Sequence, residues 1–314
     1  MSAWTTKTAY GYRSSKASSF RQLGYLAEAR IAVFNGTAQD LYAIQAFPKA
    51  QISRFNSPAD FVLALKTGKV DVAISGLLSI QEIVRENAEL AIMAGNFHNN
   101  ANGVAFRKGD QALRERFDRF LETARADGTL EGMRRRWLVE NPEAVVIPAI
   151  TIPETGETLR VGTSLLIGLP FVSQADGQFI GHDIELVQTF ASREGYQLEL
   201  VPLEFDALIA SLATGKIDMI VSQLSITPER QAKVDFSAPY SYENSAALVQ
   251  KKTWPPPSPR IWRTARTGAP GPYRQPVRPR VAGALSMICR GVELPPSPAP
   301  FRISIWPAPI PRHR

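Results

Sequence analysis

Short apolar runs alternate with amphipathic stretches along the first half of the chain. Strand patterns occupy residues 29–34, 51–55, 70–75 and 103–107. Ser57 followed by Pro58 is typical of a helix start, and residues 111–138 carry apolar side chains at helical spacing. Asp127 and Gly128 interrupt that spacing, which predicts two consecutive helices there. Strands alternating with helices predict an α/β fold with a largely parallel sheet.

A second unit with the same alternation follows a Pro-containing linker at residues 141–158. This linker predicts a domain boundary. The predicted strands of the second unit span residues 159–163, 197–201 and 217–222, its helices span residues 183–194 and 207–214, and an extended segment spans residues 245–251.

One pattern occurs once in each unit, at residues 64–75 and 211–222. Both segments contain the end of a helix, a Thr-Gly-Lys turn, an Asp, an apolar strand and a Ser. The glycine suits the left-handed conformation at a helix C-terminus, and the lysine suits the negative end of the helix dipole. The repetition is explained either by a common helix-to-strand connection or by two related lobes.

The charge of the 314-residue chain is unevenly distributed. The formal net charge is +7, but residues 253–314 contain ten Arg, no Lys and one acid, which gives +9 and leaves −2 for residues 1–252. The same segment holds 15 of the 24 Pro. We therefore expect a near-neutral globular part and a disordered Pro/Arg-rich tail, and no nucleic-acid partner.

Several classes of protein are disfavoured by composition. The single cysteine cannot form an internal disulfide, three His residues show no zinc-ligand spacing, and no cofactor is implied. No run of 18 apolar residues predicts a membrane span, and residues 1–26 form a polar, irregular start without the apolar stretch of a signal peptide. We expect no direct membrane insertion.

Three motifs in the second unit resemble the first lobe of the family 3 solute-binding proteins, the polar-amino-acid receptors of bacterial ABC importers. They are Gly181–Leu186, the segment Ser222–Arg230 that matches the family's binding segment, and Val234–Tyr240, which leads toward the hinge. Residues 27–140 resemble the family's second lobe and its C-terminal helices. The resemblance implies type II periplasmic-binding-protein lobes with central mixed sheets flanked by helices.

The order of the two lobes is the reverse of the family's. The chain is therefore either the joint of a truncated tandem receptor or a circularly permuted receptor whose halves, residues 27–140 and 159–252, complement one another. In the permuted arrangement, residues 103–107 and 245–251 are expected to be paired hinge strands. The tail from Thr253 resembles neither lobe.

The resemblance also implies a ligand-binding site. Thr227 and Pro228 are predicted to start a short helix that places Arg230 in its first turn, where a bound anion would offset an unfavourable cation. In the family, the positions of Ser225 and Arg230 hold the ligand's α-carboxylate, with help near Thr227. Gln223 stands where a small residue usually lets the ligand approach.

From the other lobe, the loop Thr37, Ala38 and Gln39 follows a strand and opens a helix, so its N–H groups suit an anion. The family's ammonium-binding Asp falls at Gly76, which has no side-chain acceptor. The alternative for this loop is a plain strand-to-helix turn, and for Thr227 and Arg230 a simple cap and a surface charge.

The expected function is non-catalytic capture of a small zwitterionic or carboxylate solute, an amino acid in the first place, for delivery to an ABC transporter permease in the periplasm or outside the cell. His182, Asp183 and Glu185 raise an enzymatic alternative, because cyclohexadienyl dehydratases share this fold. A truncated remnant without binding activity is a further alternative.

Overall fold

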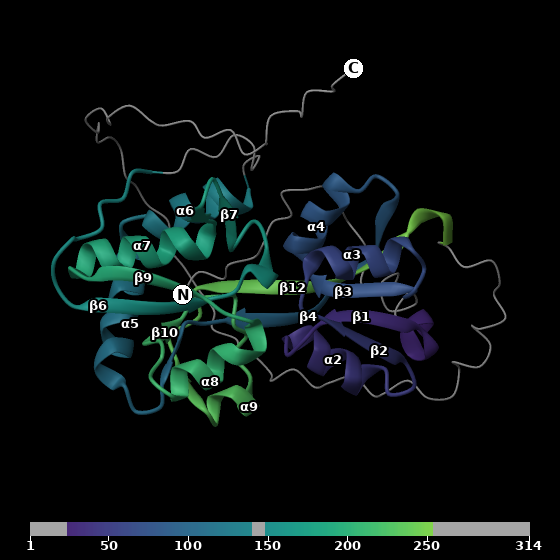
Figure 1. Cartoon of the computed structure of the whole chain (residues 1–314), viewed down its shortest axis with the longest axis horizontal. Coiled ribbons are helices and arrows are strands. Elements are labelled where there is room, and N and C mark those ends of the chain that lie inside the picture. The colour runs from purple at the N-terminus through teal and green to yellow at the C-terminus, as the bar shows by residue number, and fades with distance from the viewer. Residues whose placement is uncertain (1–23, 140–147, 254–314) are drawn as a thin grey trace, which may run out of the picture.

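The computed structural model describes residues 24–139 and 148–253 as two α/β lobes lying side by side (Figure 1). We call them the β1 lobe, residues 24–102 and 241–253, and the β6 lobe, residues 103–139 and 148–240. Each lobe is built on a five-stranded mixed sheet flanked by helices. The predicted fold class is confirmed; the predicted disordered tail, except Thr253, lies outside the described residues.

The β1 lobe contains a sheet in the order β2-β1-β3-β12-β4. Its strands are β1 (Arg30–Phe34), β2 (Gln51–Phe55), β3 (Val72–Gly76), β4 (Leu90–Asn102) and β12 (Ser241–Gln250). Its helices are the 3₁₀ helices η1 (Gly24–Glu28) and η5 (Lys251–Thr253), and α2 (Ala38–Ala46), α3 (Pro58–Lys66) and α4 (Leu77–Glu86). β1, β2 and β3 run parallel, whereas β12 is antiparallel to both β3 and β4.

The β6 lobe contains a sheet in the order β11-β5-β10-β6-β9. Its strands are β5 (Ala105–Arg107), β6 (Thr158–Thr163), β9 (Gln197–Pro202), β10 (Met219–Ile220) and β11 (Val234–Phe236), with a separate hairpin of β7 (Ser173–Ala175) and β8 (Gln178–Ile180). Its helices are α5 (Gln111–Ala126), α6 (Thr129–Leu138), η3 (Leu165–Ile167), α7 (His182–Glu194), η4 (Phe205–Ala207), α8 (Leu208–Ala213) and α9 (Pro228–Gln231).

The chain crosses between the lobes twice, and both crossings lie together. The first follows β4 and the second precedes β12, and the amide N–H of Tyr240 donates to the Asn102 carbonyl at 3.0 Å. The Ser237 N–H donates to the Val104 carbonyl at 2.9 Å. Because β12 adds to the sheet of β1 and β3, residues from both predicted halves make up each lobe.

The prediction that residues 103–107 and 245–251 pair as hinge strands is wrong. β12 pairs with β4 from Leu90 to Asn102, whereas residues 105–107 pair with β10 and β11 in the other lobe. The long strand β4 was missed because its second half, residues 97–102, is polar and Asn-rich and shows no apolar alternation.

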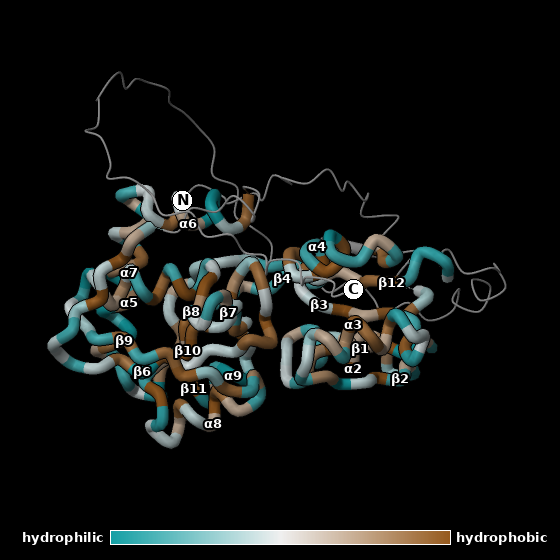
Figure 2. The backbone as a smooth tube through the Cα atoms, turned by 45° about the horizontal axis from the view of Figure 1, so that its top comes forward, coloured by the Kyte–Doolittle hydropathy of each residue, from teal (hydrophilic) through white to brown (hydrophobic). Residues whose placement is uncertain are grey.

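The helices α5 and α6 belong to the predicted half of residues 27–140, but they pack in the β6 lobe with residues of the other half. Phe117 and Phe120 of α5 contact Phe190 of α7, with ring centroids 4.9 and 5.3 Å apart. Figure 2 shows brown, apolar segments alternating with teal, hydrophilic ones along the chain in both lobes. Within residues 24–139 and 148–253, no helix combines the length and the apolar character that a bilayer span requires.

The repeated Thr-Gly-Lys pattern has the same structure in both lobes. Gly68 and Gly215 adopt φ values of +74° and +75°, as expected at a helix C-terminus. Asp71 accepts from the backbone N–H and guanidinium of Arg30, and Asp218 does the same with Arg160. The arginine is thus a further shared position, on β1 in one lobe and on β6 in the other.

We predict that Phe117→Ala lowers the free energy of unfolding by about 3–5 kcal/mol, because it removes a fully buried ring from the core between α5 and α7. Urea denaturation of the full chain measures the change. Leu63→Ala is the control, since Leu63 is 55% exposed and its loss should cost less than about 0.5 kcal/mol. Equal effects of the two variants would contradict the packing of α5 on the β6 lobe.

Candidate functional site

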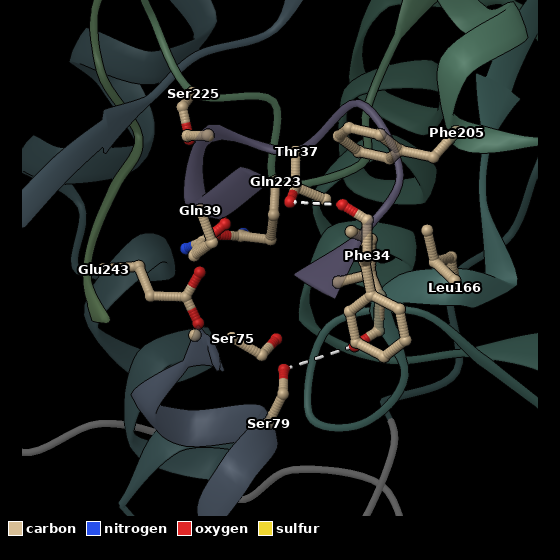
Figure 3. Close-up of a pocket in the computed structure, with 13 residues that line it drawn as sticks. Phe34, Thr37, Gln39, Ser75, Ser79, Leu166, Phe205, Gln223, Ser225 and Glu243 are labelled. Carbon is tan, nitrogen blue, oxygen red and sulfur yellow. Dashed lines mark hydrogen bonds between the residues drawn. The ribbon is translucent and has the colours of Figure 1, made fainter. Parts of the chain in front are cut away.

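A pocket lies between the two lobes and is lined by both of them (Figure 3). It encloses about 400 Å³ of empty space, part of which is open solvent. The residues that line it from the β1 lobe include Thr37, Ala38, Gln39, Ser75, Gly76 and Glu243, and those from the β6 lobe include Leu166, Phe205, Gln223 and Ser225. The position between two lobes and the mixed apolar and polar lining are typical of a small-molecule site.

Of the predicted ligand-binding residues, Thr37, Ala38 and Gln39 line the pocket at the N-terminus of α2. Thr37 is the N-cap, and its hydroxyl accepts from the Asp40 N–H at 3.3 Å. The N–H groups of Ala38 and Gln39, in the first turn, have no acceptor within the helix. This end of α2 therefore offers N–H donors and a positive dipole to a ligand.

The predicted residues on the β6 lobe divide into two groups. Gln223 and Ser225 line the pocket, whereas Thr227 and Arg230 are not among its lining residues. Thr227 is the N-cap of α9, as predicted, and accepts from the Arg230 N–H at 3.3 Å. A role for Thr227 and Arg230 in holding a ligand stays a prediction.

Arg230 joins the two lobes in this structure. Its guanidinium donates to the Ser225 carbonyl in its own lobe and to the Gly36 carbonyl in the β1 lobe, both at 2.8 Å, and lies 5.7 Å from the centre of the Phe205 ring. Burial lowers the pKa of Arg230 to about 10. A guanidinium held away from water by neutral carbonyls has an electrostatic reason to attract an anion.

Further hydrogen bonds close the lobes against each other. The Asn35 amide donates to the Asp206 carboxylate at 2.8 Å, and the Ser79 hydroxyl donates to the Ile167 carbonyl at 3.2 Å. Both bonds link the β1 lobe to the β6 lobe. The structure thus shows a closed arrangement of the two lobes.

Gln223 lies at the centre of a buried polar network beside the crossings. Its backbone adopts φ +47°, which is uncommon outside glycine. Its side-chain amide donates to Asp183 at 2.8 Å, and its Oε1 accepts from Asn102 at 2.7 Å and from Ser241 at 3.0 Å. The Gln223 amide also donates to the Tyr240 hydroxyl at 3.2 Å, so four side chains fix Gln223 in the wall of the pocket.

Glu243 is a pocket residue that the sequence reasoning missed. It lies on β12, and its carboxylate lies beside Ser75 in the close-up view (Figure 3). Its Oε1 is buried and has no hydrogen-bond partner in the described part of the chain. Burial, and secondarily the negative charge of Asp183, raise the pKa of Glu243 from 4.5 to about 8. No motif marked this residue, because its position depends on the pairing of β12.

The three residues considered for catalysis are held by structural contacts. Glu185 accepts from Arg136 and from the Trp137 indole at 2.7 Å each. Asp183 accepts from Gln223 and from the Tyr240 hydroxyl at 2.8 Å each, and His182 is 4% exposed beside Asp183. None of the three is among the residues described as lining the pocket.

We predict that Tyr240→Phe lowers the free energy of unfolding by about 1–3 kcal/mol, because Asp183 loses a hydrogen bond in a fully buried position. Urea denaturation measures the effect. Tyr242→Phe serves as the control on the neighbouring strand, because Tyr242 is 53% exposed. A Tyr240 variant as stable as the control variant would mean that the network does not support the fold.

We predict that the unfolding free energy of the unliganded chain contains a Glu243 contribution that falls as pH rises. Between pH 4.5 and about 8, the folded state keeps a proton on Glu243 that the unfolded state has released, so rising pH favours unfolding. Glu243→Gln should remove this fall. Urea midpoints of both proteins from pH 5 to 8 measure the difference, and parallel pH profiles would contradict the assignment.

Part of the chain is similar to known proteins. Residues 159–285 match the family described as bacterial extracellular solute-binding proteins, family 3. The match begins at the first strand of the second predicted unit, and it continues past Lys252 into the segment expected to resemble neither lobe.

Curated relatives include several amino-acid-binding proteins. The chain is 38% identical over 94 residues to the L-cystine-binding protein TcyJ of Escherichia coli strain K12, covering 28% of the chain and 35% of TcyJ. It is 35% identical over 126 residues to the arginine-binding extracellular protein ArtP of Bacillus subtilis strain 168, covering 38% of the chain and 49% of ArtP.

A third relative is the lysine/arginine/ornithine-binding periplasmic protein of Escherichia coli strain K12, which is 45% identical over 96 residues, covering 30% of the chain and 36% of the relative. The chain thus spans about a third to a half of the length of these relatives. Among solved structures, an ancestral arginine-binding protein bound to arginine is 40% identical over 27% of the chain and 38% of its own length, with a TM-score of 0.26.

Proposed function

Because residues 159–285 match the family 3 bacterial extracellular solute-binding proteins, we propose that the chain binds a small zwitterionic or carboxylate solute, in the first place an amino acid. In this proposal it acts without catalysis, as the substrate-binding component of an ABC importer, and delivers the solute to the transporter permease. The relatives bearing amino-acid and periplasmic or extracellular names support a place of action outside the cytoplasmic membrane.

The observation that carries the proposal is the pocket between the lobes. Residues of both lobes line it, from the start of α2 to Gln223 and Ser225, so a solute bound there would be held by both lobes at once. Such a solute would add to the contacts that close the lobes, including the bond from Arg230 to the Gly36 carbonyl. Hinge closure around a ligand works in this way.

The start of α2 and Ser225 suit the carboxylate of an amino acid. The N–H groups of Ala38 and Gln39 are donors at the positive end of a helix, and the Ser225 hydroxyl lies across the pocket on the other lobe. Ser225 donates to Asn102 at 3.0 Å in this structure, so its hydroxyl would exchange that bond for one donated to the solute carboxylate on binding. Arg230, close behind Ser225, would add positive potential.

A dehydratase activity finds less support in the structure. Asp183 and Glu185 are engaged with Tyr240, Gln223, Arg136 and Trp137, so neither carboxylate is placed in the pocket as a general acid. The family and the curated relatives named above are binding proteins. Both observations favour binding over catalysis.

We predict that at least one of the twenty L-amino acids, at millimolar concentration, raises the melting temperature of the full chain. A ligand at about 100 times its dissociation constant stabilises by about 2.7 kcal/mol. Gln39→Ala should weaken binding of that amino acid about five- to tenfold, since it removes one hydrogen-bonding side chain from the pocket.

The control for this experiment is Gln45→Ala, which changes the same residue type on the same helix at an exposed position. Calorimetric titration of the three proteins measures the affinities. The proposal is rejected if no amino acid shifts the melt, and the placement of the site is rejected if both variants bind as the unchanged chain does.

A further inference from the structure

Glu243 is the one ionisable side chain among the described residues that line the pocket. Its Oε1 atom is buried without a hydrogen-bond partner. An unpaired carboxylate withdrawn from water is costly, and the cost disappears either when a proton neutralises it or when a cation pairs with it. The geometry therefore provides a site that is complete only with a positive partner.

Gly76 makes room for this carboxylate. A Cβ atom added to Gly76 would overlap the carboxylate of Glu243, so any larger residue at the end of β3 would displace it. The backbone of Gly76 has φ −61° and ψ 140°, which every residue type adopts freely. The need for glycine here comes from Glu243 and not from backbone conformation.

Asn100 and Ser245 extend the unpartnered polar surface around Glu243. Asn100 lies directly opposite Glu243 in the antiparallel ladder, and Ser245 lies two residues further along the same face of β12. Asn100 Nδ2 and Ser245 Oγ are, like Glu243 Oε1, buried without partners in the described part of the chain. Three unsatisfied buried polar atoms at neighbouring ladder positions are unusual in a folded core, and of the three residues Glu243 is the one that lines the pocket.

We propose that Glu243 is the acceptor for a protonated nitrogen group of the solute, and that binding of this group expels a proton from the Glu243 carboxyl to the solvent. This proposal rests on the function proposed above. It adds that the positively charged part of the solute binds at the end of the pocket next to Gly76. The proton leaves Glu243 Oε and is taken up by the buffer, so that a carboxylate and a cation face each other in the complex.

The groups around Glu243 favour its protonated form before a solute binds. Asp183 on α7 adds negative charge and raises the pKa of Glu243, and Tyr240 ahead of β12 stays protonated, since its pKa is raised well above 10. On α2, Asp40 is paired with Arg54 at 2.8 Å.

The remaining charged and titratable neighbours do not neutralise Glu243 in this structure. On β4, burial lowers the pKa of His98, whose ring stacks on Tyr42 at 4.4 Å. His182 on α7 is bonded to Asp183. On α9, Arg230 donates to two backbone carbonyls. The pocket-lining residues of β3 and α4, which are Ser75, Gly76 and Ser79, carry no charge.

The test compares the full chain with Glu243→Gln and Gly76→Ala by calorimetric titration with L-arginine, L-lysine, L-histidine and L-glutamine at pH 7, in two buffers of different ionisation enthalpy. We expect both variants to bind the best of these probes about 10- to 100-fold more weakly. The unchanged chain should release close to one proton on binding, and Glu243→Gln none, because the pKa of Glu243 lies at about 8 in the unliganded protein.

Glu86→Gln is the matched control, since it removes a carboxylate from an exposed position at the end of α4 and should change neither affinity nor proton release. A chain that binds a probe with or without Glu243 equally well, or releases no proton, overturns this inference and leaves the proposed function standing. A chain that binds none of the amino acids in the melting experiment overturns both. Thermal melts of each variant confirm that weaker binding does not reflect unfolding.

Discussion

The antiparallel pairing of β12 with β3 and β4 is the interaction on which the rest of the structure depends. It brings residues 241–250 into a sheet whose other strands all lie before residue 103. Because the chain must leave the β1 lobe after β4 and return to it as β12, the whole β6 lobe is inserted between two adjacent strands. The two crossings consequently lie side by side, joined by the bond from Tyr240 to Asn102, as a hinge between two lobes requires.

The same pairing shapes the chemistry of the pocket. It places Glu243 over Gly76 and opposite Asn100, so a carboxylate reaches a position where β3 itself provides no side chain. The buried network of Gln223, Asp183 and Tyr240 stands next to the crossings and holds the opposite wall. Satisfied polar groups therefore build the frame, and the unpartnered Oε1 of Glu243 is left in the pocket between the lobes. This division between rigid frame and unpaired site is the arrangement expected of a binding protein.

The likeness between the lobes goes further than the Thr-Gly-Lys turn. Arg30 on β1 and Arg160 on β6 make the same set of bonds, with Asp71 just before β3 and with Asp218 just before β10. The glycine and lysine of the turn follow from the general chemistry of helix ends, whereas the arginine does not. The shared ion pair favours two related lobes over a coincidence of turn chemistry.

The sequence by itself determined the local elements, because their causes are local. Apolar periodicity located most strands and helices, Ser57 and Thr227 cap the helices they were expected to cap, and Asp127 and Gly128 separate α5 from α6. It also marked Thr37, Ala38, Gln39, Gln223 and Ser225, which the structure brings to one pocket. Only the tertiary structure decided that β4 is a long strand, that Arg230 bonds to the Gly36 carbonyl, and that Glu243 fills the place beside Gly76. These outcomes depend on strand pairing and lobe contact between residues far apart in the chain, and no local pattern of polar and apolar residues encodes which distant partner a strand or a charge will meet.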